Sequence, residues 1–297
     1  MRVASVLPAG TEIVAAIGAE SCLVAISHEC DYPPEVTGRP RLTWSPIQSN
    51  RSSAEIDQQV RELRASGRAV IVVDGPTLAT ARPELVLTQD LCDVCAVIDG
   101  DVRSLAQAID PPPAVLPLTA RTLEGIFSDI EAVAAALHRD RPAADLVAGL
   151  RSRLAALSAR HTGPVATVVV VEWLEPLYLG GHWVPELVRW AGGRDVGAQP
   201  GAHSARSTWH QLSALEPELI ILALCGFGLE RALAEWRRFH AGNSEEARIA
   251  AALTGQVWAI DGNAYTSRPG PRVVRGAELL ARAIEGREGP GLVRLGS

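Results

Sequence analysis

The chain has 297 residues, a net charge of −6 and a hydrophobic share of 47%. This length and apolar share predict two domains, each with its own core. The net charge is negative and no block of basic residues is present, which argues against a protein that binds the phosphates of a nucleic acid. All 28 basic residues are arginine, which excludes P-loop, protein-kinase and pyridoxal chemistry, since each of these requires a lysine.

No apolar run reaches the roughly 18 residues of a membrane helix, and the longest, Val165 to Val171, has the length of a strand. Arg2 leads directly into an apolar stretch without the pattern of a secretory leader. We therefore expect a cytoplasmic protein, or an extracytoplasmic one if a leader has been removed. Five cysteines, with Cys92 and Cys95 in a C-x-x-C pair, suit a reducing compartment.

The first part of the chain predicts an alternation of strands and helices. Strands are expected at 3–7, 23–27, 69–73 and 84–88, and helices at 11–17, 76–81 and between a Ser52-x-x-Glu55 capping box and Gly67. A polar loop that begins at His28 follows the second strand, and a loop that begins at Gln89 and Asp90 follows the last.

The stretch from Thr119 to His138 predicts one long helix. Its apolar residues recur at spacings of three and four: Leu123, Ile126, Ile130, Val133 and Leu137. Prolines precede it, and Pro142 is expected to stop it. Because an α/β pattern lies on each side, we interpret this helix as a rigid connection between two lobes, while an ordinary crossover helix in one large sheet is the alternative.

The second part repeats the α/β pattern. A helix through Leu150 and Leu154 precedes a continuous apolar strand at 165–171, as in a buried parallel sheet. A loop is expected from Trp173 to Trp183, then helices through Trp190 and at 209–215, a strand at 219–222, a helix through Trp236, a strand at 257–260, a loop at 261–271 and a last helix at about 272–284.

Two stretches match each other, Arg82-Pro83-Glu84-Leu85 and Glu216-Pro217-Glu218-Leu219. Each follows a short helix and opens a strand that ends in a loop with cysteine. We interpret the chain as two copies of one α/β lobe with mainly parallel sheets: an N-terminal lobe at 1–117, a connecting helix at 118–141 and a C-terminal lobe at 142–297. Ligands bind beyond the carboxyl ends of parallel strands, which predicts a cleft between the lobes.

A candidate metal set combines His28 and Cys30 with Cys92 and Cys95, because both loops follow strands of one lobe. Imidazole and thiolate are the usual ligands of zinc, and four groups fill a tetrahedral site. The alternative is that the cysteines are small buried side chains and that His28 anchors its loop. If the ligand brings its own chelated metal, His28 is the candidate axial ligand.

Tryptophan gives a second signal, since seven Trp accompany only three Tyr and three Phe. Trp44, Trp173 and Trp183 fall in predicted loops and are candidates for the wall of a flat ligand; capping the hydrophobic edge of a lobe is the alternative. Trp190 and Trp236 fall on helical stripes and are expected in the core. In the loop before the last helix, Arg268 is expected to hold the loop.

The sequence resembles the substrate-binding proteins of metal-chelate ABC importers, over nearly its whole length. VASVLPAGTE from Val3, PELVL from Pro83 and the closing DGNAYTSRPGPRVV carry the resemblance. SHECDYP, TQDLCDVC and CGFGLER resemble the cobalamin-binding branch and its leaderless relatives.

The resemblance implies two α/β lobes joined by a long helix and a ligand held between them, without catalysis and without a required cofactor. Cobalamin, iron–siderophore chelates and haem are the ligands it implies, with a corrinoid first. The residues expected at the ligand are His28, Glu29, Trp44, Gln89, Asp90, Trp173, Trp183, Phe227 and Tyr265. Glu55 resembles the acid of the first lobe that docks to an ABC permease, while Thr208-Trp209-His210-Gln211 has no acid for the second lobe.

We thus expect a non-catalytic binder of a metal chelate, as an importer component or a cytoplasmic carrier that hands its ligand on. It is expected to be a monomer that neither inserts into membranes nor binds nucleic acid. The alternative is a metal- or thiol-dependent enzyme that uses His28, Cys30, Cys92 and Cys95 on the same scaffold.

Overall fold

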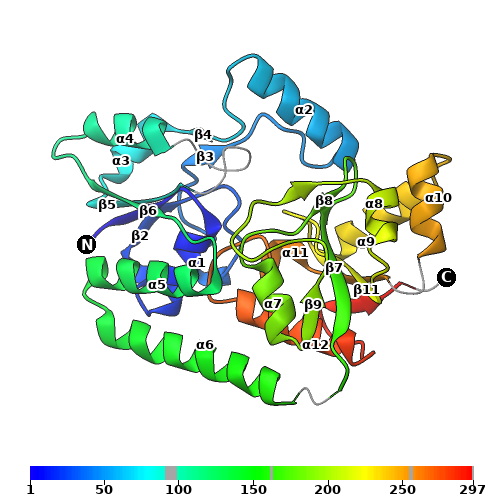
Figure 1. Cartoon of the computed structure of the whole chain (residues 1–297). Helices are drawn as coiled ribbons and strands as arrows, with labels where there is room; N and C mark the ends of the chain where they lie inside the picture. Colours follow the sequence, from blue (N-terminus) through cyan, green and yellow to red (C-terminus); the bar gives the residue numbers. More distant parts are fainter. Residues whose placement is uncertain (91–98, 161–162, 254–256, 296–297) are drawn as a thin grey trace. The chain divides into compact units, whose positions relative to one another are not determined.

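The computed structural model describes residues 1–90, 99–160, 163–253 and 257–295 (Figure 1). The chain forms two compact units, each with its own sheet. Unit 1 consists of Met1–Arg51, Gln58–Ala120 and Glu124–Gly149. Unit 2 consists of Ser52–Asp57, Arg121–Leu123 and Leu150–Ser297.

Unit 1 contains a parallel sheet of four strands in the order β2-β1-β5-β6. Its elements along the chain are β1 (Val3–Ser5), α1 (Pro8–Ala16), β2 (Leu23–Ile26), β3 (Thr43–Trp44), α2 (Ser53–Ala65), β4 (Val72–Val73), α3 (Gly75–Ala81), β5 (Leu85–Gln89), α4 (Asp99–Gln107), β6 (Ala114–Leu118) and α5 (Leu123–Leu137), of which α2 and α5 begin with residues that belong to unit 2. α1 packs on β1 and β2, and α4 on β5 and β6. Because β2, β1 and β5 run in one direction, the loops that follow them leave the same edge of the sheet.

Unit 2 is built on the parallel strands β7, β11 and β12, which are extended by antiparallel β8, β10 and β13. Its elements are β7 (Ala166–Trp173), β8 (Tyr178–Leu179), α7 (Val184–Trp190), β9 (Gly193–Asp195), β10 (Ala205–Arg206), α8 (Trp209–Ala214), β11 (Leu219–Leu222), α9 (Leu229–His240), α10 (Glu245–Ala252), β12 (Val257–Ile260), α11 (Gly262–Tyr265), α12 (Val273–Ile284) and β13 (Leu292–Arg294). The interior of β7 is buried along its length, as its apolar sequence predicts.

The repeated Pro-Glu-Leu motif has the same local structure in both units. Arg82 and Glu216, which precede the prolines, both have a positive φ, of 42° and 47°. The Glu84 carboxylate then accepts a hydrogen bond of 2.7 Å from the backbone nitrogen of Arg2, beside β1. The Glu218 carboxylate accepts one of 2.6 Å from the backbone nitrogen of Thr167, in β7. Each motif thus fastens the start of one parallel strand to its neighbour, which supports the interpretation of two related lobes.

The long central helix is confirmed as α5 (Leu123–Leu137), with its five periodic apolar residues buried. It ends at His138, whose φ is 55°. Pro142 does not stop this helix, because it lies in the first turn of the longer α6 (Asp140–Arg160). A proline is tolerated there, where the first backbone nitrogens of a helix have no partner within it. The division between the units falls inside α6, after Gly149.

Several short elements differ from the sequence prediction. The Pro-rich stretch before α5 contains β6 rather than only a turn, and the predicted loop from Trp173 to Trp183 contains β8. The loop at 261–271 begins with the helical turn α11, which Asp261 caps at the nitrogen of Ala264. Elements of two to five residues have too few side chains for a periodicity to be seen in the sequence.

The packing of α5 makes the first prediction. Ile130 is 0% exposed, so Ile130→Asp buries an unpaired carboxylate and lowers the free energy of unfolding by about 3–5 kcal/mol. Urea unfolding followed by circular dichroism measures this loss. Ala132→Asp, which places the same side chain on the exposed face of the same helix, is the matched control. Equal midpoints for the two variants contradict the packing.

Candidate functional site

In unit 1, His28 lies just after β2 and is held by a chain of hydroxyl groups. Its ring nitrogen Nδ1 lies 2.7 Å from Thr43 Oγ1, which also accepts a hydrogen bond of 3.0 Å from the His28 backbone nitrogen. The Thr43 hydroxyl donates to Ser27 Oγ at 2.9 Å. Because its single hydrogen is used there, Thr43 can only accept from the ring, so Nδ1 carries the proton and Nε2 the lone pair. Burial, aided by Arg41 and opposed by Glu29, lowers the pKa of His28 and keeps the ring neutral.

Arg41 fixes the loop that carries His28. Its guanidinium donates to three backbone carbonyls, those of Ser27 at 2.9 Å, Cys30 at 2.7 Å and Thr37 at 3.0 Å. Planar donors of this kind hold several carbonyls at once. The loop therefore has a defined shape on which the His28 imidazole is positioned.

The other ligand residues predicted in unit 1 lie in polar or exposed positions. Trp44 follows Thr43 directly and is 51% exposed, which is unusual for so large an apolar side chain. Glu29 and Asp90 are exposed and Gln89, at the end of β5, is half-buried. Since β2 and β5 flank β1, His28 and Gln89 belong to the same edge of this sheet.

The structure describes only part of the predicted metal set. Cys30 is 1% exposed, and its Sγ lies 3.1 Å from Thr11 Oγ1. His28 contacts a different hydroxyl group, that of Thr43. Cys92 and Cys95 lie outside the described residues. Among the residues that are described, no group of three or more His, Cys, Asp or Glu side chains is placed to hold a metal ion. The four-residue set stays a prediction.

In unit 2, aromatic side chains gather where β7 and β11 end. Trp173 Nε1 donates to the carbonyls of Ser53 and Glu175, both at 3.1 Å, and its ring meets Phe227 edge to face at 5.2 Å. The Arg231 guanidinium stacks on the same Phe227 ring, 3.5 Å from its centre. Phe227 is 2% exposed, so its present contacts are structural, while Trp173 is only half-buried.

Trp183 is buried rather than in an open loop. It is 4% exposed and its Nε1 donates to the carbonyl of Thr266 at 2.9 Å. Tyr265 is half-buried, with Arg272 6.0 Å from its ring centre. Arg268 is 6% exposed and donates to the Asn263 side chain at 3.0 Å, so it holds its loop as expected.

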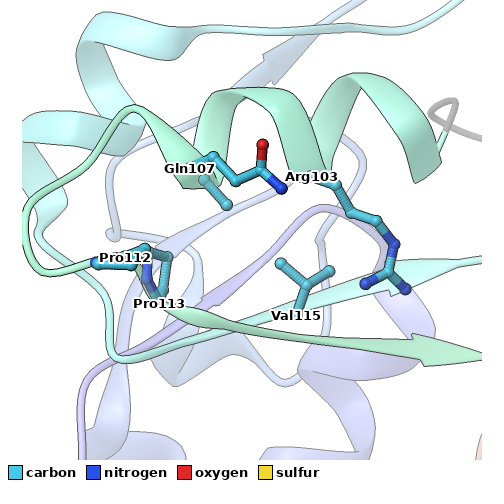
Figure 2. A pocket seen from close by; sticks show the side chains of 6 residues that line it. Arg103, Gln107, Pro112, Pro113 and Val115 are labelled. Atoms are coloured by element: carbon cyan, nitrogen blue, oxygen red, sulfur yellow. The ribbon is translucent and has the colours of Figure 1, made fainter.

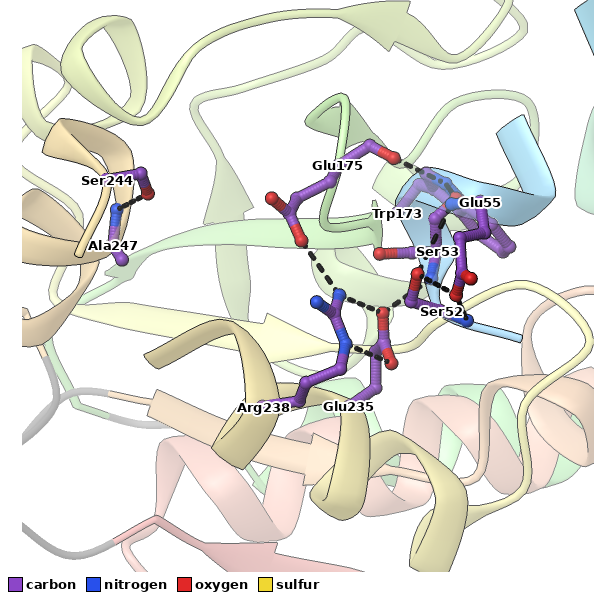
Figure 3. Close-up of polar contacts among 9 residues, drawn as sticks. All are labelled: Ser52, Ser53, Glu55, Trp173, Glu175, Glu235, Arg238, Ser244 and Ala247. Carbon is purple, nitrogen blue, oxygen red and sulfur yellow. Dashed lines mark hydrogen bonds and ion pairs between the residues drawn. The ribbon is translucent and has the colours of Figure 1, made fainter. Parts of the chain in front are cut away.

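Glu55, the predicted docking acid, closes the capping box of α2 (Figure 3). Its carboxylate accepts from the Ser52 backbone nitrogen at 2.9 Å and from the Ser52 hydroxyl at 2.6 Å, as the sequence predicts. The next backbone nitrogen, of Ser53, donates to Glu235 at 2.6 Å. Glu235 is also bound twice by Arg238, at 2.7 and 3.1 Å, and Arg238 reaches Glu175 at 2.8 Å. A buried acid from α9 thus supports the start of α2.

A histidine pair was not predicted from the sequence. The rings of His182 and His203 lie edge to face with centres 5.2 Å apart. Backbone bonds join their segments, from His182 to the carbonyl of Ala202 at 2.6 Å and from Gly201 to the carbonyl of His182 at 2.8 Å. Burial, the neighbouring His203 and Arg121 lower the pKa of His182. The signal in the sequence was the Gly180-Gly181 pair, since a Cβ on Gly181 would meet the Ser204 nitrogen at 2.4 Å.

A shallow depression of about 170 Å³ lies between α4 and β6 (Figure 2). Arg103, Gln107, Pro112 and Val115 are among its lining residues. None of the predicted ligand residues lines it, and a drug-sized ligand needs roughly 300 Å³ or more. We therefore do not assign it a role.

The sequence profile of the periplasmic binding protein family matches residues 3–264. The vitamin B12-binding protein of Vibrio cholerae serotype O1 is 22% identical to this chain and covers 96% of it, with 89% of its own length matched. Among solved structures, a periplasmic heme-binding protein from Pseudomonas aeruginosa superposes with a TM-score of 0.73 at 18% identity, and covers 100% of this chain and 98% of its own. The periplasmic vitamin B12-binding protein of Vibrio cholerae gives 0.61 at 20% identity, with 96% of each chain covered.

The chain therefore belongs to the periplasmic binding protein family, and its two α/β lobes have the fold of these structures. This confirms the predicted fold class. It also overturns the alternative of an enzyme, because the family consists of binding proteins. In the part of the chain that the structure describes, no helix is both long enough and apolar enough to cross a membrane.

The Glu235 network makes the second prediction. Burial alone would raise the pKa of Glu235, but the hydrogen bonds from Arg238 and Ser53 outweigh it and the pKa is lowered. A carboxyl whose pKa is lowered by folding stabilises the folded state at every pH above its pKa in the unfolded chain. This stabilisation is lost as the pH falls through the pKa of the folded state. Glu235→Gln should cost about 1–3 kcal/mol at pH 7 and flatten the loss of stability in acid. Glu230→Gln, exposed on the same helix, should show neither effect in urea unfolding.

The third prediction concerns Asp195, at the end of β9. Its Oδ1 accepts from Gly197 and Ala198 at 2.8 and 3.1 Å, while the buried Oδ2 has no partner among the described residues. Burial raises the pKa of this carboxyl to about 7. The folded state then keeps a proton that the unfolded chain, with a pKa of about 3.9, releases. Stability should fall between about pH 4 and pH 7 as the pH rises.

Asp195→Asn removes the titrating group and should remove this slope from a series of urea-unfolding experiments. The exposed Asp145→Asn variant should keep it. A slope that is the same in all three proteins would show that Asp195 ionises in the folded state as easily as in the unfolded chain.

Proposed function

We propose that this protein is the substrate-binding component of an ABC importer and binds a metal chelate of the cobalamin, haem or siderophore type, with a corrinoid as the first candidate. Family membership supports the importer class. Relatives named as vitamin B12-binding and heme-binding proteins support the ligand type. The observation that carries the proposal is the hydroxyl chain that leaves His28 Nε2 with its lone pair.

His28 suits a metal that already sits in a macrocycle. Four ring nitrogens fill the equatorial positions of a corrinoid or a haem, so a protein need supply only an axial ligand. An imidazole coordinates when it is neutral and when its other nitrogen is held by a hydrogen bond, which orients the ring. Both conditions are met at His28, through its lowered pKa and its bond to Thr43.

Trp44 suits the flat apolar surface of such a ligand. An exposed indole loses unfavourable contact with water when a planar ligand covers it. In the sequence, Trp44 directly follows Thr43, whose hydroxyl group holds the His28 ring. In unit 2, Trp173 is the half-buried aromatic side chain that we propose for the same role, whereas buried Phe227 packs against its ring and buried Trp183 donates to the Thr266 carbonyl.

We further propose an ABC permease as the partner, with Glu55 at the docking surface. Its carboxylate already caps α2 through Ser52, so an arginine of the partner would share it with the helix start. The cytoplasmic location expected from the sequence stays a prediction, and fractionation of the host cell with an antibody against the chain is the measurement that tests it.

Titration with aquocobalamin and with haemin tests the ligand class. Replacement of the axial water by an imidazole should shift the visible absorption bands, and the bound ring should quench tryptophan fluorescence. Saturation at one equivalent with such a shift for either compound supports the proposal. Absence of both changes for both compounds at concentrations of tens of micromolar would falsify tetrapyrrole binding, and ferric siderophores are then the ligands that remain.

His28 and the tryptophans are tested by substitution. His28→Ala should weaken binding at least tenfold and abolish the band shift, while His210→Ala, exposed on α8, should change neither. Trp44→Ala should weaken binding through lost contact. Trp236→Ala should leave affinity unchanged and lower the melting temperature, because Trp236 is 4% exposed within an aromatic cluster with Trp209 and Phe239. An unchanged affinity in His28→Ala removes this residue from the site.

A further inference from the structure

Trp173, the aromatic side chain of unit 2 that we propose as a ligand contact, also holds the start of α2 (Figure 3). Its single indole N–H is divided between two backbone carbonyls, those of Ser53 and Glu175, both at 3.1 Å. Ser53 is the first residue of α2 and is 0% exposed. Because the indole is only half-buried, it keeps a surface that a ligand can cover while its N–H stays on the helix start.

These bonds belong to a closed ring of five residues, all of them in unit 2 (Figure 3). The Ser53 backbone nitrogen donates to Glu235 at 2.6 Å, and Arg238 donates to the same carboxylate at 2.7 and 3.1 Å. Arg238 also donates to Glu175 at 2.8 Å, and the indole of Trp173 closes the ring. The other links involve charged groups and are the stronger kind of hydrogen bond. The divided N–H of the neutral indole is therefore the weakest link of the ring.

The turn that this ring holds carries Glu55, the acid proposed for docking. Its carboxylate accepts from the backbone nitrogen and from the hydroxyl of Ser52, at 2.9 and 2.6 Å. Ser52 directly precedes Ser53 in the chain, and the Glu55 side chain is exposed. The position of the docking carboxylate thus depends on the same first turn of α2 that Trp173 contacts.

A ligand that covers the indole strengthens the bond from Trp173 to α2. A flat ring stacked on Trp173 fixes the orientation of the indole and removes water from around it. Hydrogen bonds are electrostatically stronger where the local dielectric constant is low. The loaded protein therefore holds the Ser53 carbonyl more firmly than the empty protein does. A ligand shifts an equilibrium between two states only through such a difference in its interaction with them.

We propose that Trp173 couples ligand binding to the first turn of α2, so that a bound ligand stabilises this turn and the Glu55 carboxylate on it. This coupling rests on the proposed function, since it takes Trp173 as a ligand contact and Glu55 as a docking acid. A single hydrogen bond of this kind corresponds to a coupling of about two- to tenfold. Because coupling is reciprocal, a permease that docks on the ordered turn raises the affinity for the ligand by the same factor and so distinguishes loaded from empty protein.

Hydrogen exchange followed by mass spectrometry tests the coupling in the whole protein. The protein is compared empty and saturated with aquocobalamin or haemin, whichever of the two shifts its absorption bands on binding. The amides to follow are those of Ser53 and Ile56, which donate to Glu235 and to the Ser52 carbonyl. Exchange of these amides reports the opening of the first turn of α2.

Trp173→Phe is the informative variant, because it keeps an aromatic ring for the ligand and removes the N–H that reaches Ser53. Trp258→Phe is the matched control, since Trp258 is buried in β12 and is 3% exposed. Circular dichroism verifies that both variants are folded, and an absorption titration sets the ligand concentration that saturates each protein.

We expect the ligand to slow exchange of the two amides about two- to tenfold in the parent and in Trp258→Phe, and to leave it unchanged in Trp173→Phe. Equal slowing in Trp173→Phe overturns the coupling through the indole. Unchanged exchange in a parent that binds the ligand overturns it as well, and in both cases the proposed function stands. If neither compound binds to the parent, tetrapyrrole binding and the coupling fail together.

Discussion

The two sheets depend on one repeated interaction, a glutamate that fastens the start of one parallel strand to its neighbour. Glu84 does this for β5 and β1, and Glu218 does it for β11 and β7. Parallel strands have no tight turn to set their register, so a hydrogen bond that joins the first residues of two strands helps to align the ladder. The register then determines which residues leave the far edge of each sheet, where His28 in one unit and Trp173 in the other are found.

Much of this could be predicted from the sequence because it follows from local patterns. The apolar period of three and four identified α5, the apolar run at 165–171 identified β7, and the repeated Pro-Glu-Leu motif identified two related lobes. Ser52 and Glu55 were recognised as a capping box, whose bonds lie within four residues of the chain. In each case the partners are near in sequence or the pattern repeats, so a single sequence contains the required information.

Side-chain partners that are far apart in the sequence could not be predicted. The contact of Cys30 with Thr11, of Trp183 with the Thr266 carbonyl and of Glu235 with Ser53 each joins segments that only the folded chain brings together. Loop position alone suggested that Trp183 is open to a ligand, yet the second residue after the Gly180-Gly181 pair turns inward, where the Thr266 carbonyl accepts from its indole. The same limit applies to Thr43, which decides the tautomer of His28 from a neighbouring short strand.

Two histidine environments illustrate why residue type alone does not define a metal site. At His28, one nitrogen is occupied by Thr43, so the ring offers a single lone pair in a fixed direction, which suits one axial position. At His182, a second imidazole stands edge to face with ring centres 5.2 Å apart, and Nε2 is buried without a hydrogen-bond partner among the described residues. The difference arises from the partner of each ring and not from the histidine itself.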